Sequence, residues 1–235
     1  MTVFGIGDYH GESINPFLEE EQPSLEDEIL STGDFDRTSI IHELLSIKNN
    51  PESASVTDVI GNHDHALLEK ISLNSSTIKS QDLRFQEMVE ELHSDSEAKK
   101  YIDNLSTSQF KEFQVGPLDG VLVHGGLAGY LQNPDIPDEV KPFWYRLWYE
   151  EDFQENLGIM AENDYDIMVR GHDHWTEHAF RAKCSNEEIS YHLPEAGDSY
   201  NLEEDFRHII THGPWYEGNY IKLDEETLEL SFKSL

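Results

Sequence analysis

Thr2-Val3-Phe4-Gly5-Ile6-Gly7-Asp8-Tyr9-His10 decides the fold of this chain, because a short apolar run passes through a glycine into an Asp-x-His block. A run of this kind, rich in aliphatic and β-branched residues, is typical of a buried strand. Four further blocks follow apolar runs in the same way, namely Gly33-Asp34, Gly61-Asn62-His63-Asp64, His124-Gly125-Gly126 and Gly171-His172-Asp173-His174. This repetition predicts an α/β fold that gathers its functional residues at strand ends.

The apolar runs before the four later blocks cover residues 28–32, 56–60, 121–123 and 165–169. Every polar block therefore lies at the C-terminal end of a predicted strand, where open α/β sheets place their ligand crevice. Residues at i and i+2 of an extended chain point to the same side, about 6.5 Å apart. On that geometry we expect Asp8 and His10 to share one ion, and His172 and His174 to reach two.

The side chains of these blocks are hard oxygen donors and imidazoles. The candidate metal ligands are Asp8, His10, Asp34, Asn62, His124, His172 and His174. With no thiolate in the set, the donors suit Mn²⁺, which we expect first, or Fe or Zn²⁺. Two divalent ions about 3.5–4 Å apart are typical of phosphate-ester hydrolases. Their charge outweighs that of the two aspartates, so the site keeps a positive potential that attracts phosphate.

The five blocks, in this order, resemble those of the calcineurin-like metallophosphoesterase superfamily. Within it, several segments are similar to bacterial and phage phosphoprotein (Ser/Thr) phosphatases. These segments are Gly33-Asp34-Phe35-Asp36-Arg37, residues 61–69, Val123-His124-Gly125-Gly126-Leu127 and residues 211–223. The likeness covers nearly the whole chain. It implies a four-layer α/β/β/α sandwich formed by a single domain, residues 1–235.

The resemblance also implies a role for each residue of the blocks. The first ion would be bound by Asp8, His10, Asp34 and His174, and the second by Asp34, Asn62, His124 and His172. Asp34 would therefore bridge the two ions. His63 would act as the general acid that protonates the leaving alkoxide, a transfer that contributes roughly 10²–10⁴-fold to the rate. Asp36 would orient His63.

The second block departs from the family pattern. The family has two residues between its aspartates, whereas Phe35 alone separates Asp34 from Asp36 here. One deleted residue in a tight loop re-aims the side chains that follow it, so the roles of Asp36 and Arg37 stay open. Arg37 and Arg146 are candidate phosphate clamps, because a guanidinium fork matches phosphate oxygens. An ordinary surface position is the alternative for both arginines.

Three functions remain compatible with the motifs. The first is dinuclear-metal-dependent hydrolysis of phosphate monoesters, most closely by a Ser/Thr-type protein phosphatase. The second is a nucleotide phosphodiesterase or pyrophosphohydrolase of the diadenosine polyphosphate type, which the same ions could serve. The third is a non-catalytic binding module, which the loss of several ligands would indicate, and none of the ligands is lost. The phosphorylated substrate stays undecided, because substrate choice depends on the shapes of loops.

Charge is the second strong signal in the sequence. With 16 Lys+Arg against 48 Asp+Glu, the net charge is −32, and the acidic residues are spread over nearly every segment. A local acidic block would indicate a disordered arm. Diffuse acidity together with 37% hydrophobic residues predicts a folded protein adapted to the high salt of a halophile's cytoplasm, with an ordinary acidic enzyme as the alternative. A direct nucleic-acid-binding surface is not expected, since phosphate backbones need clustered Lys and Arg.

Length and cysteine usage agree with a cytoplasmic enzyme. A chain of 235 residues can bury a full core as one α/β domain. No run of about 18 apolar residues exists, and the N-terminus enters a strand directly, so we expect neither a membrane span nor a signal peptide. The lone Cys184 excludes an internal disulfide and fits a reducing compartment.

The remaining segments predict the elements around the site. Residues 66–113 read as helices that either cover a sheet or cap the site, the former being preferred. Helical spacing in residues 143–149 favours core packing of Phe143, Trp144, Leu147 and Trp148 over a substrate-facing aromatic wall. Asp64 is expected either in the site or as the N-cap of a helix starting near His65. After residue 178, alternating runs predict a second, antiparallel sheet. These runs are 189–193, 208–212, 220–223 and 228–232.

Overall fold

The computed structural model describes residues 1–72, 83–106, 108–132, 136–184 and 188–235. Its first sheet contains β1 (Thr2–Ile6), β2 (Glu28–Ser31), β3 (Ser55–Asp58), β9 (Ser199–Asn201), β11 (Asn219–Asp224) and β12 (Glu229–Ser234). Its second sheet contains β4 (Phe110–Val115), β5 (Leu118–Val123), β6 (Ile167–Arg170), β7 (Thr176–Ala182), β8 (Ser190–His192) and β10 (Phe206–His212). The strand orders are β3-β2-β1-β11-β12-β9 and β4-β5-β6-β10-β7-β8.

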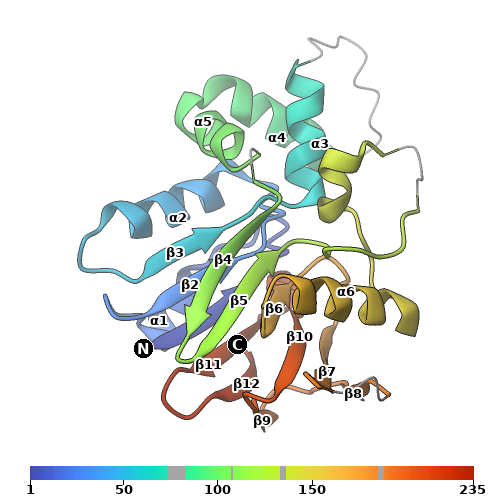
Figure 1. Cartoon of the computed structure of the whole chain (residues 1–235). Coiled ribbons are helices and arrows are strands. Elements are labelled where there is room, and N and C mark those ends of the chain that lie inside the picture. The colour runs from blue at the N-terminus through green and yellow to red at the C-terminus, as the bar shows by residue number, and fades with distance from the viewer. Residues whose placement is uncertain (73–82, 107, 133–135, 185–187) are drawn as a thin grey trace.

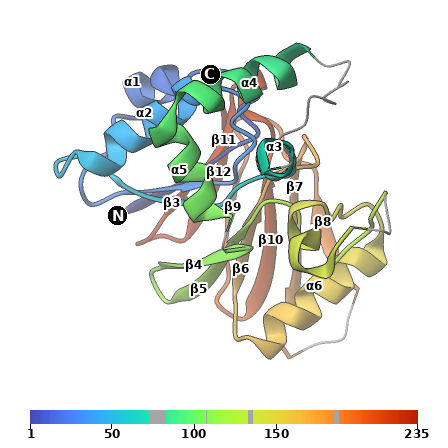
Figure 2. The ribbon, with the colours of Figure 1, turned by 90° about the horizontal axis from the view of Figure 1, so that it is seen from above.

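Helices flank the two sheets. They are α1 (Asn15–Glu21), α2 (Thr38–Asn49), α3 (Asn62–Ser72), α4 (Leu83–Ser94), α5 (Ser96–Leu105) and α6 (Glu150–Glu162). Short 3₁₀ turns occur at Asp138–Phe143 and Trp215–Glu217. Seen from above, α1 and α2 lie on one side of the paired sheets and α6 lies on the other (Figure 2). The four-layer α/β/β/α sandwich expected from the sequence is therefore confirmed (Figure 1).

The alternation of side chains along the strands builds three cores, one between each pair of layers. In β1, Phe4 turns outward and joins the cluster that contains the apolar residues of α1 and α2. Its neighbour Val3 turns inward and shares the cluster between the sheets with Leu122 and Val169 of the second sheet. On the far side, Met168 joins the cluster beneath α6. Burial on both faces explains why these strands read as continuous apolar runs.

The division of strands between the sheets differs from the expectation. The strands after residue 178 do not form a separate sheet, because β9, β11 and β12 extend the first sheet while β7, β8 and β10 extend the second. Both sheets are mixed: β1 pairs in parallel with β2 and antiparallel with β11. The strands β5 and β6, which carry the last two blocks, belong to the second sheet. The blocks therefore meet where the carboxyl ends of strands from both sheets converge.

The aromatic segment 143–149 does not form the expected helix. The 3₁₀ turn that contains Pro142 ends at Phe143, and the backbone of Arg146 then pairs with Tyr130 in an isolated antiparallel bridge. The N–H of Arg146 donates to the carbonyl oxygen of Tyr130 at 3.0 Å and not back into a helical turn, so this tertiary pairing replaces the helix. Phe143 and Leu147 are buried as expected, but Trp148 is 41% exposed, so its predicted place in the core is wrong.

The expected helical region 66–113 is helical over α3, α4 and α5, and it ends in β4. Residues 73–82 of this region lie outside the described residues. The buried side chains of Met88, Val89 and Ile102 share a cluster with the apolar residues of α2, so α4 and α5 pack against α2, and the choice between sheet cover and cap stays a prediction. Among the described residues, no helix is long and apolar enough to cross a membrane.

Candidate metal centre

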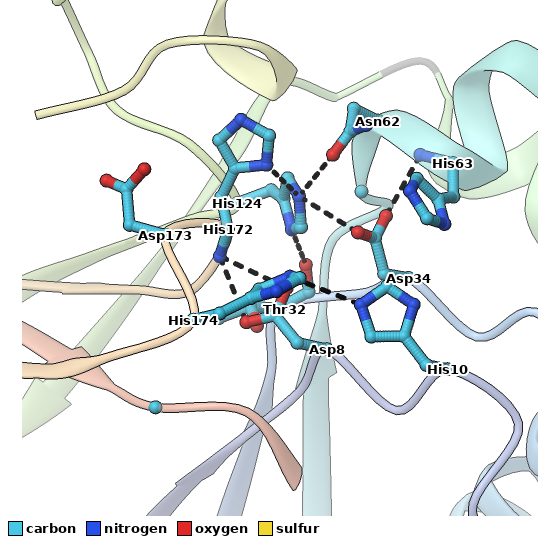
Figure 3. A network of polar contacts seen from close by, with 12 residues as sticks. Asp8, His10, Thr32, Asp34, Asn62, His63, His124, His172, Asp173 and His174 are labelled. Carbon is cyan, nitrogen blue, oxygen red and sulfur yellow. Dashed lines mark hydrogen bonds and ion pairs between the residues drawn. The ribbon is translucent and has the colours of Figure 1, made fainter. Parts of the chain in front are cut away.

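All seven predicted ligands converge on one site at the carboxyl ends of the strands (Figure 3). Asp8 and His10 follow β1, Asp34 follows β2, and Asn62 begins α3 just after β3. The two remaining segments come from the second sheet, where the His124 block follows β5 and the Gly171–His174 block follows β6. Blocks that are far apart in the sequence thus meet across the two sheets.

The backbone brings these side chains together by left-handed turns, not by extended chain. The φ angles are positive at Asp8 (51°), His10 (47°), Asp34 (59°), Asp36 (55°), His172 (71°) and His174 (60°). Each of these conformations is strained for a residue with a Cβ, and such strain gathers at functional sites. We expected extended backbone to point Asp8 and His10 to the same side, and His172 and His174 likewise. That geometry is wrong, because the backbone at these residues is left-handed.

Two glycines allow the loops after β2 and β3 to touch. A Cβ on Gly33, whose φ is +88°, would lie 2.2 Å from the backbone nitrogen of Gly61. A Cβ on Gly61 would lie 1.9 Å from Asp34 Oδ1 and 2.7 Å from His124 Cε1. Side chains cannot occupy such positions, so glycine is required wherever the backbone approaches the ligands this closely.

The first group of candidate ligands joins the two sheets. Asp8, His10, Asp34 and His174 each offer one donor atom, and these atoms lie within 4.8 Å of one another. His10 Nε2 is 3.2 Å from His174 Nε2, and the latter is 3.8 Å from Asp8 Oδ1. Asp8 also accepts the backbone N–H of His172 at 3.0 Å, which ties the loop after β6 to the end of β1.

The second group consists of Asp34, His124 and His172, again within 4.8 Å, with Asn62 alongside. His124 Nε2 lies 3.0 Å from Asn62 Oδ1, 3.1 Å from His172 Nδ1 and 3.5 Å from Asp34 Oδ2. His124 Nδ1 must donate to the carbonyl oxygen of Thr32 at 2.7 Å, so Nε2 presents a lone pair to those oxygens. Several acceptors thus face one another, which is an arrangement that suits a cation. Asp34 belongs to both groups and is placed to bridge them.

The pKa shifts describe three neutral imidazoles and crowded carboxylates, whereas the pKa of His10 is raised, against the effect of burial, by the hydrogen bond to Asp36. Burial lowers the pKa of His124 to about 3 and that of His172 well below its ordinary value. The pKa of His174 falls to about 4, mainly by burial and then by the charge of His10. Neutral imidazole is the form that binds metal. Burial and the neighbouring charge of Asp34 raise the pKa of Asp8 to about 8, so cations would stabilise its ionised form. The residues therefore fit two divalent cations.

His63 and Asp36 lie next to the first group. Asp36 Oδ2 is 2.7 Å from His10 Nδ1 and 3.1 Å from His63 Nδ1. The side chain of His63 is 41% exposed, and its backbone N–H donates to Asp34 Oδ1 at 3.0 Å. The charge of Asp34, more than the bond to Asp36, raises the pKa of His63 to about 10. Although its loop is one residue shorter than the family pattern, Asp36 lies within hydrogen-bonding distance of His63, as the orienting role requires.

The two arginines predicted as phosphate clamps differ in their surroundings. Arg37 pairs with Glu91 at 2.9 Å and with Glu87 at 2.6 Å, both on α4, so its guanidinium is already held by carboxylates. Arg146 donates to the carbonyl oxygen of His172 at 3.2 Å and forms an ion pair with Asp173 Oδ1 at 3.0 Å, with 25% of its side chain exposed. Both guanidinium groups are thus held by carboxylates, but Arg146 contacts the loop that carries His172, and both clamp roles stay predictions.

The sequence left the role of Asp64 undecided. Its buried carboxylate accepts the backbone N–H groups of Asp34 at 2.8 Å, Phe35 at 3.1 Å and Gly61 at 2.9 Å. The helix α3 begins at Asn62, so Asp64 does not cap a helix starting at His65. Instead it fixes the loop that carries the bridging aspartate to the loop that carries Asn62.

Other supporting residues gave little signal in the sequence. Arg170 is fully buried and donates to Asp173 Oδ2 at 2.6 Å, to Thr211 Oγ1 at 3.2 Å and to the carbonyl oxygen of Gly125. In the sequence, this network is indicated only by a single arginine at the end of an apolar run. His212, buried and 2.9 Å from Thr32 Oγ1, holds the end of β10 against the loop after β2.

Comparison with known proteins agrees with this geometry. Residues 1–190 match the model of the calcineurin-like phosphoesterase superfamily domain. A metallophosphoesterase from Sphaerobacter thermophilus has a similar fold, with a TM-score of 0.69 and 19% identity over 100% of this chain and 88% of that one. A hypothetical protein from Pyrococcus horikoshii OT3 also has a similar fold, with a TM-score of 0.59 and 13% identity over 100% of this chain and 87% of that one. A search of curated proteins found no match. The chain belongs to the calcineurin-like phosphoesterase superfamily.

Proposed function

We propose that this metallophosphoesterase hydrolyses phosphate monoesters at a centre of two divalent cations, with Mn²⁺ as the first candidate. The observation that carries the proposal is the position of Asp34, which belongs to both groups of candidate ligands. When bound, the two ions supply positive charge for the phosphate and activate the water that attacks phosphorus. A carboxylate shared between two clusters is what such a paired centre needs.

The protein side chains supply the proton and the orientation. The bond from His63 Nδ1 to Asp36 turns Nε2 of the same ring away from the carboxylate. We assign to Nε2 the proton that passes to the leaving oxygen, which makes His63 the general acid. Arg146, anchored on the carbonyl oxygen of His172, would bind a phosphate oxygen and align the ester.

Two substrate classes follow from different observations. The motif likeness favours a phosphoserine or phosphothreonine side chain, hydrolysed by a protein phosphatase. An aromatic pocket next to Arg146, lined by Trp148 and Trp175 among others, favours a nucleotide. Both classes are esters of poor leaving groups, so both need the general acid.

A substrate panel tests the monoesterase proposal. Purified protein with Mn²⁺ and molar KCl would be assayed on p-nitrophenyl phosphate, bis-p-nitrophenyl phosphate, a phosphoserine peptide and nucleotides. We expect the monoesters to be hydrolysed with a higher kcat/KM than bis-p-nitrophenyl phosphate, and the Asp34→Asn variant to lose both activities. A preference for the diester would contradict the monoesterase assignment, and activity that persists in the Asp34→Asn variant would contradict the proposed centre.

A further inference from the structure

A pocket of about 650 Å³ lies beside the metal centre, between the start of α6, the start of β7 and the end of β8. Its lining is mainly aromatic and aliphatic, with one carboxylate on β7. The residues that matter here are Leu147, Trp148, Trp175, Glu177, Tyr191 and Leu193. A pocket of this size can enclose a small organic group.

The wall of this pocket is attached to the loop that carries the candidate ligands. Trp175 directly follows His174 in the sequence. The backbone N–H of Leu147 donates to Asp173 Oδ2 at 3.2 Å. Arg146 bonds to the carbonyl oxygen of His172, and its guanidinium carbon lies 5.6 Å from the ring centre of Trp148. Arg146 thus contacts both the loop that carries the candidate ligands and the wall of the pocket, and this is the path we assign to a molecule whose phosphate lies at the centre.

The apolar surface of the pocket is unusually open to solvent. Trp148 and Trp175 are each 41% exposed, and Leu193 is 76% exposed. One face of Trp148 stacks on Tyr130 with ring centres 5.3 Å apart, so the indole is held in place. Exposed apolar side chains gathered in one patch mark a binding site more often than single ones do. Their flat rings suit a flat ligand.

Glu177 gives the pocket a polar end. This residue is only 8% exposed although it carries a carboxylate. It accepts one hydrogen bond, from Trp175 Nε1 at a long 3.4 Å. In the described part of the chain neither oxygen of Glu177 is both buried and unpaired, so the carboxylate reaches solvent in the pocket that it lines and keeps acceptor positions free there. A ligand that brings two adjacent N–H groups would satisfy Glu177.

We propose that this pocket binds the base of a guanine nucleotide whose phosphate lies at the metal centre. The inference rests on the proposed function, because it names the substrate of the same site. Among the common bases, guanine offers two neighbouring N–H donors on one edge, which match a carboxylate, and two flat apolar faces. A small alkylammonium group would also suit a carboxylate, but it would leave most of the aromatic and aliphatic wall uncovered.

The test compares kcat/KM for guanosine, adenosine and uridine 5′-monophosphates with that for p-nitrophenyl phosphate, on the Mn²⁺-loaded protein. We expect guanosine monophosphate to exceed adenosine monophosphate by about tenfold or more, as loss of bonds to a charged group implies. Glu177→Gln should remove this preference and leave kcat on p-nitrophenyl phosphate unchanged. Trp175→Ala should raise KM for all the nucleotides, whereas Trp175→Phe should retain most of the affinity. Glu150→Gln, at the rim of the same pocket, is the matched control and should keep the preference.

The outcomes separate the inference from the proposed function. Hydrolysis of p-nitrophenyl phosphate without any guanine preference would overturn the pocket assignment alone. A preference for phosphocholine or a phosphoserine peptide that disappears in Glu177→Gln would also overturn it, in favour of a cation or a peptide. If no ester is hydrolysed, the proposed function fails, and calorimetry with guanosine monophosphate then tests the pocket. Binding that Glu177→Gln weakens would support the assignment, and no binding would overturn it.

Discussion

The carboxylate of Asp36 lies 3.1 Å from Nδ1 of His63, and its Oδ2 lies 2.7 Å from Nδ1 of His10. One side chain therefore supports both the candidate general acid and a candidate metal ligand. Hydrogen bonds from these histidines, together with their charge, hold the pKa of Asp36 well below its ordinary value even though burial acts in the opposite direction. If His63 donates the proton and His10 binds a metal ion, as proposed, Asp36 would couple the two functions.

His63→Ala should affect esters according to their leaving group. For an alkyl ester such as phosphoserine, kcat/KM should fall roughly 10²–10⁴-fold, because the leaving alkoxide loses its proton donor. For p-nitrophenyl phosphate the loss should be much smaller, since p-nitrophenolate leaves without protonation. Metal content, measured by elemental analysis, should not change. Equal losses on both esters would argue against the general-acid role.

Asp36→Asn extends the same experiment by separating the two partners of Asp36. Loss of a carboxylate behind a ligating histidine typically lowers metal affinity about 10–100-fold. We therefore expect the Asp36→Asn variant to need more Mn²⁺ for full activity, whereas His63→Ala should not. At saturating Mn²⁺, the leaving-group dependence of Asp36→Asn should approach that of His63→Ala. An unchanged Mn²⁺ requirement would mean that His10 does not depend on Asp36.

Asp34→Asn should weaken both ions at once. An amide lacks the negative charge and the second anionic oxygen that a bridge between two cations uses. We expect fewer than two Mn²⁺ per chain in the variant at concentrations that saturate the wild type, with a far-ultraviolet circular dichroism spectrum that does not change. Asp103→Asn, on the exposed face of α5, is the control for an altered surface charge. A single bound ion per chain in the wild-type protein would contradict the proposed two-ion centre.

Arg170 should be among the residues that matter most for stability. It is fully buried and pairs at 2.6 Å with the buried Asp173, whose other cation, Arg146, lies at 3.0 Å and is partly exposed. Removing one partner of a buried pair costs about 3–5 kcal/mol, which is an upper limit for Arg170→Met because Arg146 still neutralises Asp173. Lys222→Met, which breaks the partly exposed pair with Glu21, should cost about 0–1 kcal/mol. Denaturant unfolding measures both. Adding Asp173→Leu to Arg170→Met should recover part of the loss, and no recovery would mean that packing, not the unpaired charge, dominates.

The histidine pair on β7 and β10 should make stability depend on pH. His178 Nε2 lies 3.1 Å from His208 Nδ1, and burial lowers their pKa values to about 3 and about 4. In the unfolded chain both histidines have a pKa of about 6.5. Between those limits the unfolded chain binds protons that the folded chain does not, so stability is complete above about pH 6.5 and is lost as the pH falls toward 4. His178→Phe should reduce the slope of unfolding free energy by up to about 1.4 kcal/mol per pH unit. Parallel curves for the two proteins would contradict this account.

The sequence indicated which side chains converge at the candidate metal centre, because the signals of these residues are local. Asp8, Asp34 and His124 each stand just after an apolar run, and a glycine marks where the backbone must pass closely. The sheets were harder, because β1 and β5 read as equally apolar and only long-range pairing places them in different sheets. Asp64 and Arg170 act through contacts between distant loops, so a single residue type gave no indication of their partners.

Salt should stabilise this protein if its acidity reflects a halophilic origin. The Debye length is about 30 Å at 0.01 M and about 3 Å at 1 M, so a net charge of −32 repels itself across the whole chain in dilute buffer and is screened in molar salt. The same screening reduces repulsion between the surface and an anionic substrate, while short-range bonds at the metal centre persist. We therefore expect the melting temperature to rise as the KCl concentration increases from 0.05 to 3 M, where the Debye length is about 3 Å or less. KM should fall over the same range until weaker electrostatics at the site reverse the trend. Greatest stability and activity in dilute buffer would exclude the halophilic origin and leave the phosphoesterase assignment untouched, because the acidic surface and the ligand set are separate features of the chain.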